Sequence, residues 1–165
     1  MENKNLVDIL GFEGLYKFDI ELNKVYSLYT NKYLKNSLDN KGYYRVWLRK
    51  NKIKTTFSIH RLCYMCNYPT EDISLLEIDH IDMDKLNNKI ENLRKCCKSD
   101  NSSNKIVYKN NKLGIKNISE SRNGYIFQLT KNGKHYAKRF KKLQDAIDYR
   151  DIKVKEINGE FARLD

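Results

Sequence analysis

The stretch Leu76-Glu-Ile-Asp-His-Ile-Asp-Met-Asp-Lys-Leu-Asn-Asn-Lys-Ile-Glu-Asn-Leu93, continued by Ser99-Asp100-Asn101, is the most informative part of the chain. Asp79 offers a hard carboxylate oxygen to a divalent cation, and the adjacent His80 offers a base that titrates near neutral pH. These groups are the ones needed to hydrolyse a phosphodiester bond with one metal ion and one activated water. The stretch therefore predicts a metal-dependent hydrolytic site.

The same stretch predicts its local structure. The run from Leu75 to Ile78 predicts a short strand, residues 81–91 a polar loop, and residues 92–95 a second strand that returns antiparallel. Adjacent residues on a regular strand point to opposite faces, so we expect Asp79 and His80 where the strand ends and the loop begins. Ser99 is the expected N-cap of a following helix, which would place Asp100 and Asn101 in its first turn.

The spacing of the polar residues resembles that of a known family. Asn92 follows His80 by twelve residues and Asn101 follows nine residues later, as in the HNH homing endonucleases in which a carboxamide replaces the last histidine. The resemblance implies a ββα-metal core and site-specific cleavage of DNA by a phage or mobile-element protein. Because one chain would carry one active site, we expect it to nick one strand at a time. It implies that Asp79 and Asn101 hold one Mg²⁺ or Mn²⁺, that His80 is the general base, and that Asn92 orients the imidazole.

The motif also departs from the family pattern. Met83 stands where a glycine is usual, which should restrict the loop backbone, and Arg94-Lys95 replace the usual acid-aromatic pair. These substitutions leave an alternative open: a non-catalytic, sequence-specific DNA-binding protein on a degenerate HNH scaffold. A plainer alternative makes residues 79–92 an Asx-rich turn with an incidental histidine.

Composition indicates a nucleic-acid partner. The 165 residues include 32 lysines and arginines against 21 acids, a net charge of +11, and the isoelectric point is about 9.4. Because no long apolar run exists, double-stranded DNA is a better partner than a membrane. The polar amino-terminus lacks the apolar stretch of a signal peptide, which predicts a cytoplasmic protein of a bacterial host or phage-infected cell. We expect a monomer.

The segment before the motif predicts a helix with a buried cysteine pair. Ile59, Leu62, Cys63 and Cys66 form an apolar stripe at helical spacing, and His60 and Arg61 open the helix. His60 is expected to be structural, and Arg61 is a candidate contact to DNA phosphate. Four thiols, with Cys96-Cys97, raise the alternative of a zinc-stabilised nucleic-acid module. Because zinc knuckles need Cys-x-x-Cys on a turn, structural zinc is not expected.

Residues 1–56 carry short strand-like runs at 15–20, 24–28 and 43–48, and Tyr44, Val46 and Leu48 alternate with more polar positions. Residues 7–61 resemble the small amino-terminal module often joined to HNH homing nucleases, which implies DNA contact. Arg45 is the candidate contact in this segment. The alternative is that the segment only supports the nuclease.

Residues 109–165 predict a three-stranded antiparallel sheet packed on one helix. Asn123-Gly124 and Asn132-Gly133 predict two-residue hairpin turns, and the apolar stripe from Leu143 to Ile157 predicts a helix with Gly159 as its C-cap. This segment holds 14 basic residues against 7 acids. Its pattern resembles the ethylene-response-factor type of DNA-binding domain. The candidate DNA contacts are Arg122, Gln128, Thr130, Lys131, Lys138 and Arg139.

The sequence as a whole thus predicts an α+β protein with three modules. These are a β-rich nuclease-associated module (1–56), an HNH core (57–108) and an ethylene-response-factor-like domain (109–165).

Overall fold

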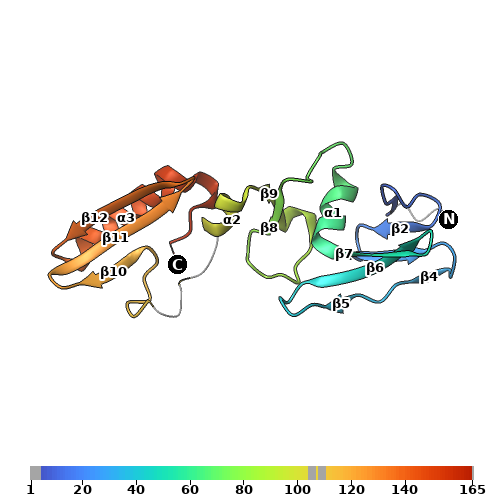
Figure 1. The fold of residues 1–165 in the computed structure, drawn as a ribbon, viewed down its shortest axis with the longest axis horizontal. Coiled ribbons are helices and arrows are strands. Elements are labelled where there is room, and N and C mark those ends of the chain that lie inside the picture. Colours follow the sequence, from blue (N-terminus) through green and yellow to red (C-terminus); the bar gives the residue numbers. More distant parts are fainter. Residues whose placement is uncertain (1–4, 104–106, 108–110, 165) are drawn as a thin grey trace. The chain divides into compact units, whose positions relative to one another are not determined.

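The computed structural model describes residues 5–103, 107 and 111–164, and it has the predicted α+β architecture (Figure 1). The chain divides into two compact units, Met1–Lys95 and Cys96–Asp165. The predicted three-module division stays a prediction. Among the residues that the structure describes, no helix is long and apolar enough to span a membrane.

The first unit begins with two antiparallel sheets. One has the strand order β1 (Leu6–Asp8), β2 (Tyr16–Asp19), β3 (Lys24–Ser27) and β4 (Lys32–Tyr33). The other has the order β5 (Ser37–Leu38), β6 (Tyr44–Lys50) and β7 (Ile53–Ser58). Asn23 and Asn31, with φ of 52° and 51°, lie in the tight turns that enter β3 and β4. Asparagine tolerates this left-handed conformation better than most residues, which is why short strands can reverse here.

One core joins these sheets to α1 (Ile59–Asn67). The predicted alternation in β6 is confirmed, because Val46 and Leu48 are fully buried while Trp47 is 45% exposed. Ile59 and Leu62 of α1 are also fully buried in this cluster. Burying each such aliphatic side chain contributes about 1.5–3 kcal/mol, so the amino-terminal sheets and α1 stabilise each other.

The signature stretch forms a two-stranded sheet of β8 (Glu77–His80) and β9 (Leu93–Cys96), with the 3₁₀ turn η1 (Ile90–Asn92) leading into β9. The predicted end of the first strand was too early. Asp79 and His80 are the last two residues of β8, and Ile81 N still donates to the main-chain oxygen of Asn92, the last residue of η1, at 2.9 Å.

The second unit contains a three-stranded antiparallel sheet of β10 (Ile118–Ser121), β11 (Gly124–Lys131) and β12 (Lys134–Phe140). The helices are α2 (Lys98–Ser103) and α3 (Leu143–Asn158), and the 3₁₀ turn η2 (Gly159–Phe161) follows α3. Phe127 of β11 and Val154 of α3 are fully buried in one cluster. The predicted sheet with one packed helix, and Gly159 as its C-cap, are confirmed.

The two hairpin predictions had different outcomes. Asn132 and Gly133 both adopt positive φ, 49° and 76°, and form the predicted two-residue turn between β11 and β12. The first turn lies one residue earlier than predicted, at residues 122–123, because Gly124 already pairs with Ser121. Gly124 is needed for another reason. A Cβ at this position would lie 2.2 Å from Phe140 O, so the adjacent strand leaves no room for a side chain.

Candidate active site

Asp79 and His80 are both buried at the end of β8, at 7% and 4% exposure. They have different neighbours, as expected for adjacent residues of a strand. Asp79 contacts Arg94 of β9, while His80 lies beside Asn88, Tyr43 and His60. The site therefore separates a carboxylate from an imidazole on two sides of one strand.

The Asp79 carboxylate is ion-paired inside the protein. Arg94 Nε and Nη2 each lie 3.1 Å from Asp79 Oδ2, and the two side chains are 15% (Arg94) and 8% (Asp79) exposed. Arg94 is one of the two departures from the family pattern noted in the sequence. The substitution thus places a fixed positive charge on a proposed metal ligand.

The loop between β8 and η1 is ordered by the Asn92 side chain. Its amide nitrogen donates to Asp82 Oδ1 and Asn87 O, both at 2.8 Å, and its oxygen accepts from Asp82 N at 3.0 Å. Met83 adopts a φ of 65°, and its main-chain N donates to His80 O at 3.0 Å. A positive φ is unfavourable for a residue that carries a side chain, which is the physical reason why methionine in place of glycine should restrict the loop backbone.

The partner of the His80 ring is Asn88, which is not among the predicted site residues. Nε2 of His80 lies 3.1 Å from Asn88 Oδ1, and Asn88 is 5% exposed. The sequence contains two adjacent asparagines at 87 and 88, and only their burial distinguishes them. The proposed role of Asn92 in orienting the imidazole stays a prediction. In this structure Asn92 would orient His80 indirectly, through its hydrogen bonds to Asp82 and Asn87 in the loop.

His60 lies against His80, with ring centroids 5.1 Å apart, and Tyr43 lies 5.0 Å from the His60 ring. Burial lowers the pKa of His60 to about 3, and the neighbouring His80 and Arg61 act in the same direction. Its Nδ1 is buried without a hydrogen-bond partner among the residues that the structure describes. His60 is therefore neutral near pH 7 and forms an uncharged wall of the site.

Asn101, the second proposed metal ligand, lies in α2 and so belongs to the second unit. The helix begins one residue before the predicted Ser99 cap. Cys97 N donates to Asp100 Oδ2 at 3.4 Å and Asp100 N donates to Cys97 Sγ at 3.4 Å, which is a reciprocal capping arrangement with a thiol in the place of a hydroxyl. The main-chain N of Asn101 donates to Cys97 O at 3.0 Å, as the first helical bond.

The donor set fits a hard divalent cation in its chemistry. A buried carboxylate and a carboxamide both present oxygen, the ligand that Mg²⁺ and Mn²⁺ prefer. Within residues 5–103, 107 and 111–164, no three His, Cys, Asp or Glu side chains gather into a group that could hold a metal.

The cysteines have a different character. Burial raises the pKa of Cys63 to about 11 and of Cys66 to about 12, so both are neutral thiols at pH 7. The absence of structural zinc stays a prediction.

Two of the candidate DNA contacts are used inside the protein. Arg61 Nη1 and Nη2 donate to Leu76 O and Ile73 O, both at 2.8 Å, and so tie α1 to the segment before β8. Lys131 is 8% exposed, and its ammonium lies 2.6 Å from Asp100 Oδ1. Both side chains thus have partners inside the protein, main-chain oxygens for Arg61 and the partly exposed Asp100 for Lys131, and their role as DNA contacts stays a prediction.

The remaining candidates lie on different faces. Gln128, Thr130 and Arg139 lie on the sheet face opposite Phe127 and are exposed, and Arg122 lies in the exposed hairpin turn. Lys138 pairs with Phe127 and so lies on the helix side, with its ammonium 4.3 Å from the Tyr149 ring centroid. Arg45 in β6 donates from Nε to Asp39 Oδ2 at 2.7 Å.

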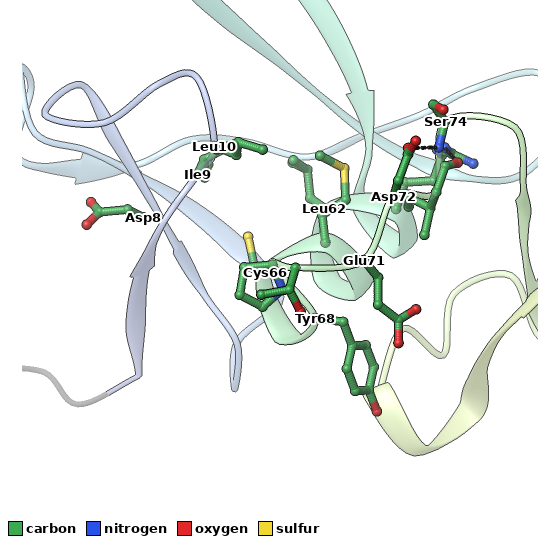
Figure 2. Close-up of a pocket in the computed structure, with 14 residues that line it drawn as sticks. Asp8, Ile9, Leu10, Leu62, Cys66, Tyr68, Glu71, Asp72 and Ser74 are labelled. Carbon is green, nitrogen blue, oxygen red and sulfur yellow. Dashed lines mark hydrogen bonds between the residues drawn. The ribbon is translucent and has the colours of Figure 1, made fainter.

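A separate pocket lies beside α1 (Figure 2). Apolar side chains such as Leu10 and Leu62 line it, together with the carboxylates of Asp8, Glu71 and Asp72. Neither Asp79 nor His80 lines this pocket. Three carboxylates repel phosphate, so the pocket is a poor candidate for a DNA contact.

Comparison with known proteins connects this geometry to a family. The family model for the HNH endonuclease matches residues 58–103, which include α1, the β8–β9 pair and α2. Protein 3.8 of Escherichia phage T7 is 33% identical over 89 residues, which are 53% of this chain and 74% of that protein. The chain belongs to the HNH endonuclease family. A second relative, the uncharacterized HNH endonuclease L560 of Acanthamoeba polyphaga mimivirus, is 36% identical over 105 residues, 63% of this chain and 54% of that protein.

A third relative of this HNH chain has a solved structure. DNA endonuclease I-HmuI of Bacillus phage SP01 is 38% identical over 89 residues, 53% of this chain and 49% of that protein. The structure reported for DNA binding and cleavage by the HNH homing endonuclease I-HmuI aligns with 93% of this chain and 90% of that one, at a TM-score of 0.55 and 26% identity. In the sequence comparison the HNH chain spans about half the length of both I-HmuI and L560.

Proposed function

We propose that this HNH chain is a site-specific, divalent-metal-dependent DNA endonuclease of the homing type, which hydrolyses phosphodiester bonds and nicks one strand. The observation that carries the proposal is the buried Asp79-His80 pair within the segment that matches the family. The structural likeness to I-HmuI, a homing endonuclease reported to bind and cleave DNA, supports it. We further propose that the chain acts as a monomer on double-stranded DNA in the cytoplasm of a bacterial or phage-infected cell.

His80 is the proposed general base. Its neighbour His60 is neutral near pH 7, so His80 has no second imidazolium beside it when it accepts the proton of the attacking water. Asp79 and Asn101 are the residues that would hold Mg²⁺ or Mn²⁺. When bound, such an ion neutralises charge on the scissile phosphate and on the departing oxygen. Arg94 keeps the Asp79 carboxylate in place through two hydrogen bonds to one oxygen.

The second unit is the proposed source of sequence preference. The exposed sheet face of β11 and β12 carries Gln128, Thr130 and Arg139, and the supporting face is packed on α3. Amide and hydroxyl groups can read base edges, while arginine can contact either guanine or phosphate. This arrangement supports the ethylene-response-factor-like assignment of residues 109–165. For residues 1–56 we propose an auxiliary DNA contact through Arg45. The guanidinium of Arg45 also forms an ion pair with Asp39.

Cleavage of supercoiled plasmid tests the function. The full chain should convert plasmid to the open-circular form in the presence of Mg²⁺ or Mn²⁺, and EDTA should stop the reaction. His80→Ala should abolish nicking and leave DNA affinity nearly intact, because a neutral imidazole contributes little to phosphate binding. His135→Ala, a change of an exposed histidine in β12, is the control for the rate of nicking and not for DNA affinity, because His135 lies beside Thr130 on the proposed DNA-reading face. Nicking by His80→Ala at the wild-type rate would exclude His80 as the base.

One observation favours a second candidate, the non-catalytic DNA-binding protein. The positive charge of Arg94 on Asp79 opposes the approach of a divalent cation to that carboxylate. If the full chain binds a target duplex tightly and yet leaves plasmid intact at every metal concentration, while Arg94→Met restores nicking, the second candidate is the better description.

A further inference from the structure

We infer that Asn88 is the residue that positions His80, and that it holds the imidazole in the tautomer with its proton on Nε2. In that tautomer the lone pair lies on Nδ1, the nitrogen that would act as the base. The identity of the base rests on the proposed function, whereas the tautomer is a property of the folded chain alone.

The contact is buried on both sides. His80 is 4% exposed and Asn88 is 5% exposed, and Nε2 lies 3.1 Å from Oδ1. In a buried place an unmade hydrogen bond is costly enough to decide between two tautomers that are close in energy in water.

The orientation of the Asn88 amide decides which group donates. Asn88 Nδ2 donates to Leu86 O at 3.2 Å, so the nitrogen end of the amide faces the loop backbone and the oxygen end faces His80. An amide oxygen can only accept, and therefore Nε2 of the imidazole must carry the hydrogen. In a neutral imidazole the other nitrogen then holds the lone pair.

The surroundings of the ring oppose the alternative orientation. The His60 and Tyr43 rings lie 5.1 and 6.0 Å from the His80 ring, and Tyr43 also contacts His60. Rotation of the imidazole by half a turn would place a C–H group opposite Asn88 Oδ1. A buried acceptor would then lose its donor, so the hydrogen bond selects the ring orientation seen here.

Asn88 and Asn92 therefore have different tasks. Both amide donors of Asn92 are used within the loop, at Asp82 and Asn87, and its oxygen accepts from Asp82 N. Asn87, the neighbour of Asn88, donates to Asp82 Oδ2 at 2.7 Å. Asn87→Ala is consequently a matched control: the same residue type is truncated in the same loop without removing the acceptor of His80.

Nitrogen NMR reports the tautomer directly and needs neither DNA nor metal. In uniformly ¹⁵N-labelled wild-type protein at about pH 8, where an ordinary histidine is neutral, long-range ¹H–¹⁵N spectra should show His80 with a protonated Nε2 and an unprotonated Nδ1. Asn88→Ala should change this into a mixture of tautomers, and Asn87→Ala should not. Asn88→Asp, which keeps an acceptor at the same place, should retain the protonated Nε2.

The kinetics of nicking of supercoiled plasmid provide the second readout. Asn88→Ala should lower kcat by about 10- to 100-fold with little change in KM, and Asn88→Asp should recover part of the loss. A wild-type His80 protonated on Nδ1, or an Asn88→Ala protein with the wild-type tautomer, would overturn the inference. If Asn88→Ala does not fold, Asn88→Asp tests the inference instead. Loss of the His80 Nε2 proton in Asn88→Asp would equally overturn the inference. A protein with the expected tautomers that never cleaves DNA contradicts the proposed function and leaves the Asn88 contact standing.

Discussion

Arg94 donates from Nε and Nη2 to the same carboxylate oxygen of Asp79, and both bonds are 3.1 Å long. The pair joins β9 to β8, and the Asp79 side chain is only 8% exposed. The proposed metal ligand is thus neutralised by a residue of the adjacent strand. Removal of Arg94 should therefore lower the stability of the metal-free protein and strengthen the binding of a divalent cation.

Arg94→Met should destabilise the metal-free protein by about 3–5 kcal/mol, because it removes the positive charge that is ion-paired with the buried Asp79 carboxylate. The same change should lower the concentration of Mn²⁺ or Mg²⁺ needed for half-saturation, since the competing charge is gone. Thermal unfolding in a metal titration measures both effects, because an ion that binds only the folded state raises Tm. Lys95→Met is the control, since Lys95 forms an exposed pair with Glu71 that contributes at most about 1 kcal/mol. Equal metal-induced stabilisation of Arg94→Met and the wild type would show that Arg94 does not compete with the ion.

His60 should make the protein sensitive to acid. Its folded pKa, about 3, lies below the value of about 6.5 for an unfolded chain, so the unfolded state binds the proton first. Stability should therefore fall as the pH drops from about 6.5 toward about 3, by about 2 kcal/mol at pH 5. Urea unfolding of His60→Gln between pH 7 and pH 5 should show a smaller decrease than the wild type, and His135→Gln should match the wild type. Parallel decreases in His60→Gln and the wild type would mean that His60 is not the acid-sensitive group.

Arg139 and Gln128 should contribute differently to DNA binding. Both lie on the exposed face of the sheet in the second unit. If Arg139 contacts phosphate, Arg139→Ala should weaken binding to all duplexes and reduce the slope of log affinity against log salt by about one. Gln128→Ala should instead reduce preference for the target over a scrambled duplex, by about 1–3 kcal/mol, without changing that slope. An unchanged preference and an unchanged slope in the double variant would remove this face from the DNA interface.

Gly124 and Gly133 form a matched pair for stability. A Cβ at Gly124 would lie 2.2 Å from Phe140 O, whereas at Gly133 it would meet nothing within 4 Å. Gly124→Ala should cost about 2–5 kcal/mol, because the β11–β12 pair must separate to admit the methyl group. Gly133→Ala should cost only about 1–2 kcal/mol, the penalty for a left-handed residue that carries a side chain. Chemical denaturation of the two variants measures the difference, and equal losses would contradict the clash.

Local pattern predicted the parts of the fold that depend on local energies. Asn132-Gly133 forms a turn because its residues tolerate positive φ wherever they occur in a chain. Asn123-Gly124 contains the same residues, yet Gly124 is required by the approach of a carbonyl from β12. Such a contact joins residues far apart in the sequence, so the pattern could not distinguish a glycine of a turn from a glycine of a close approach.

The candidate site shows the same limit. The Asp79-His80 pair is visible in the sequence because metal and proton chemistry need those residue types. The internal use of Arg61 and Lys131 is not visible, since it depends on main-chain oxygens at 73 and 76 and on Asp100, 31 residues from Lys131. Asn88 could not be distinguished from Asn87 by residue type, because only the packing of the loop decides which amide is buried.

The loop after β8 has a consequence for the thermodynamics of DNA binding. Asn92 ties it through three hydrogen bonds, and Lys85 Nζ donates to Lys41 O at 2.8 Å, which anchors the loop to the turn before β6. The conformational entropy of these residues is therefore given up when the chain folds and not when a ligand arrives. A preorganised loop leaves more of the interaction free energy with DNA available for affinity and for alignment of the reacting groups. Calorimetry of target binding should accordingly show no large ordering contribution from residues 81–92.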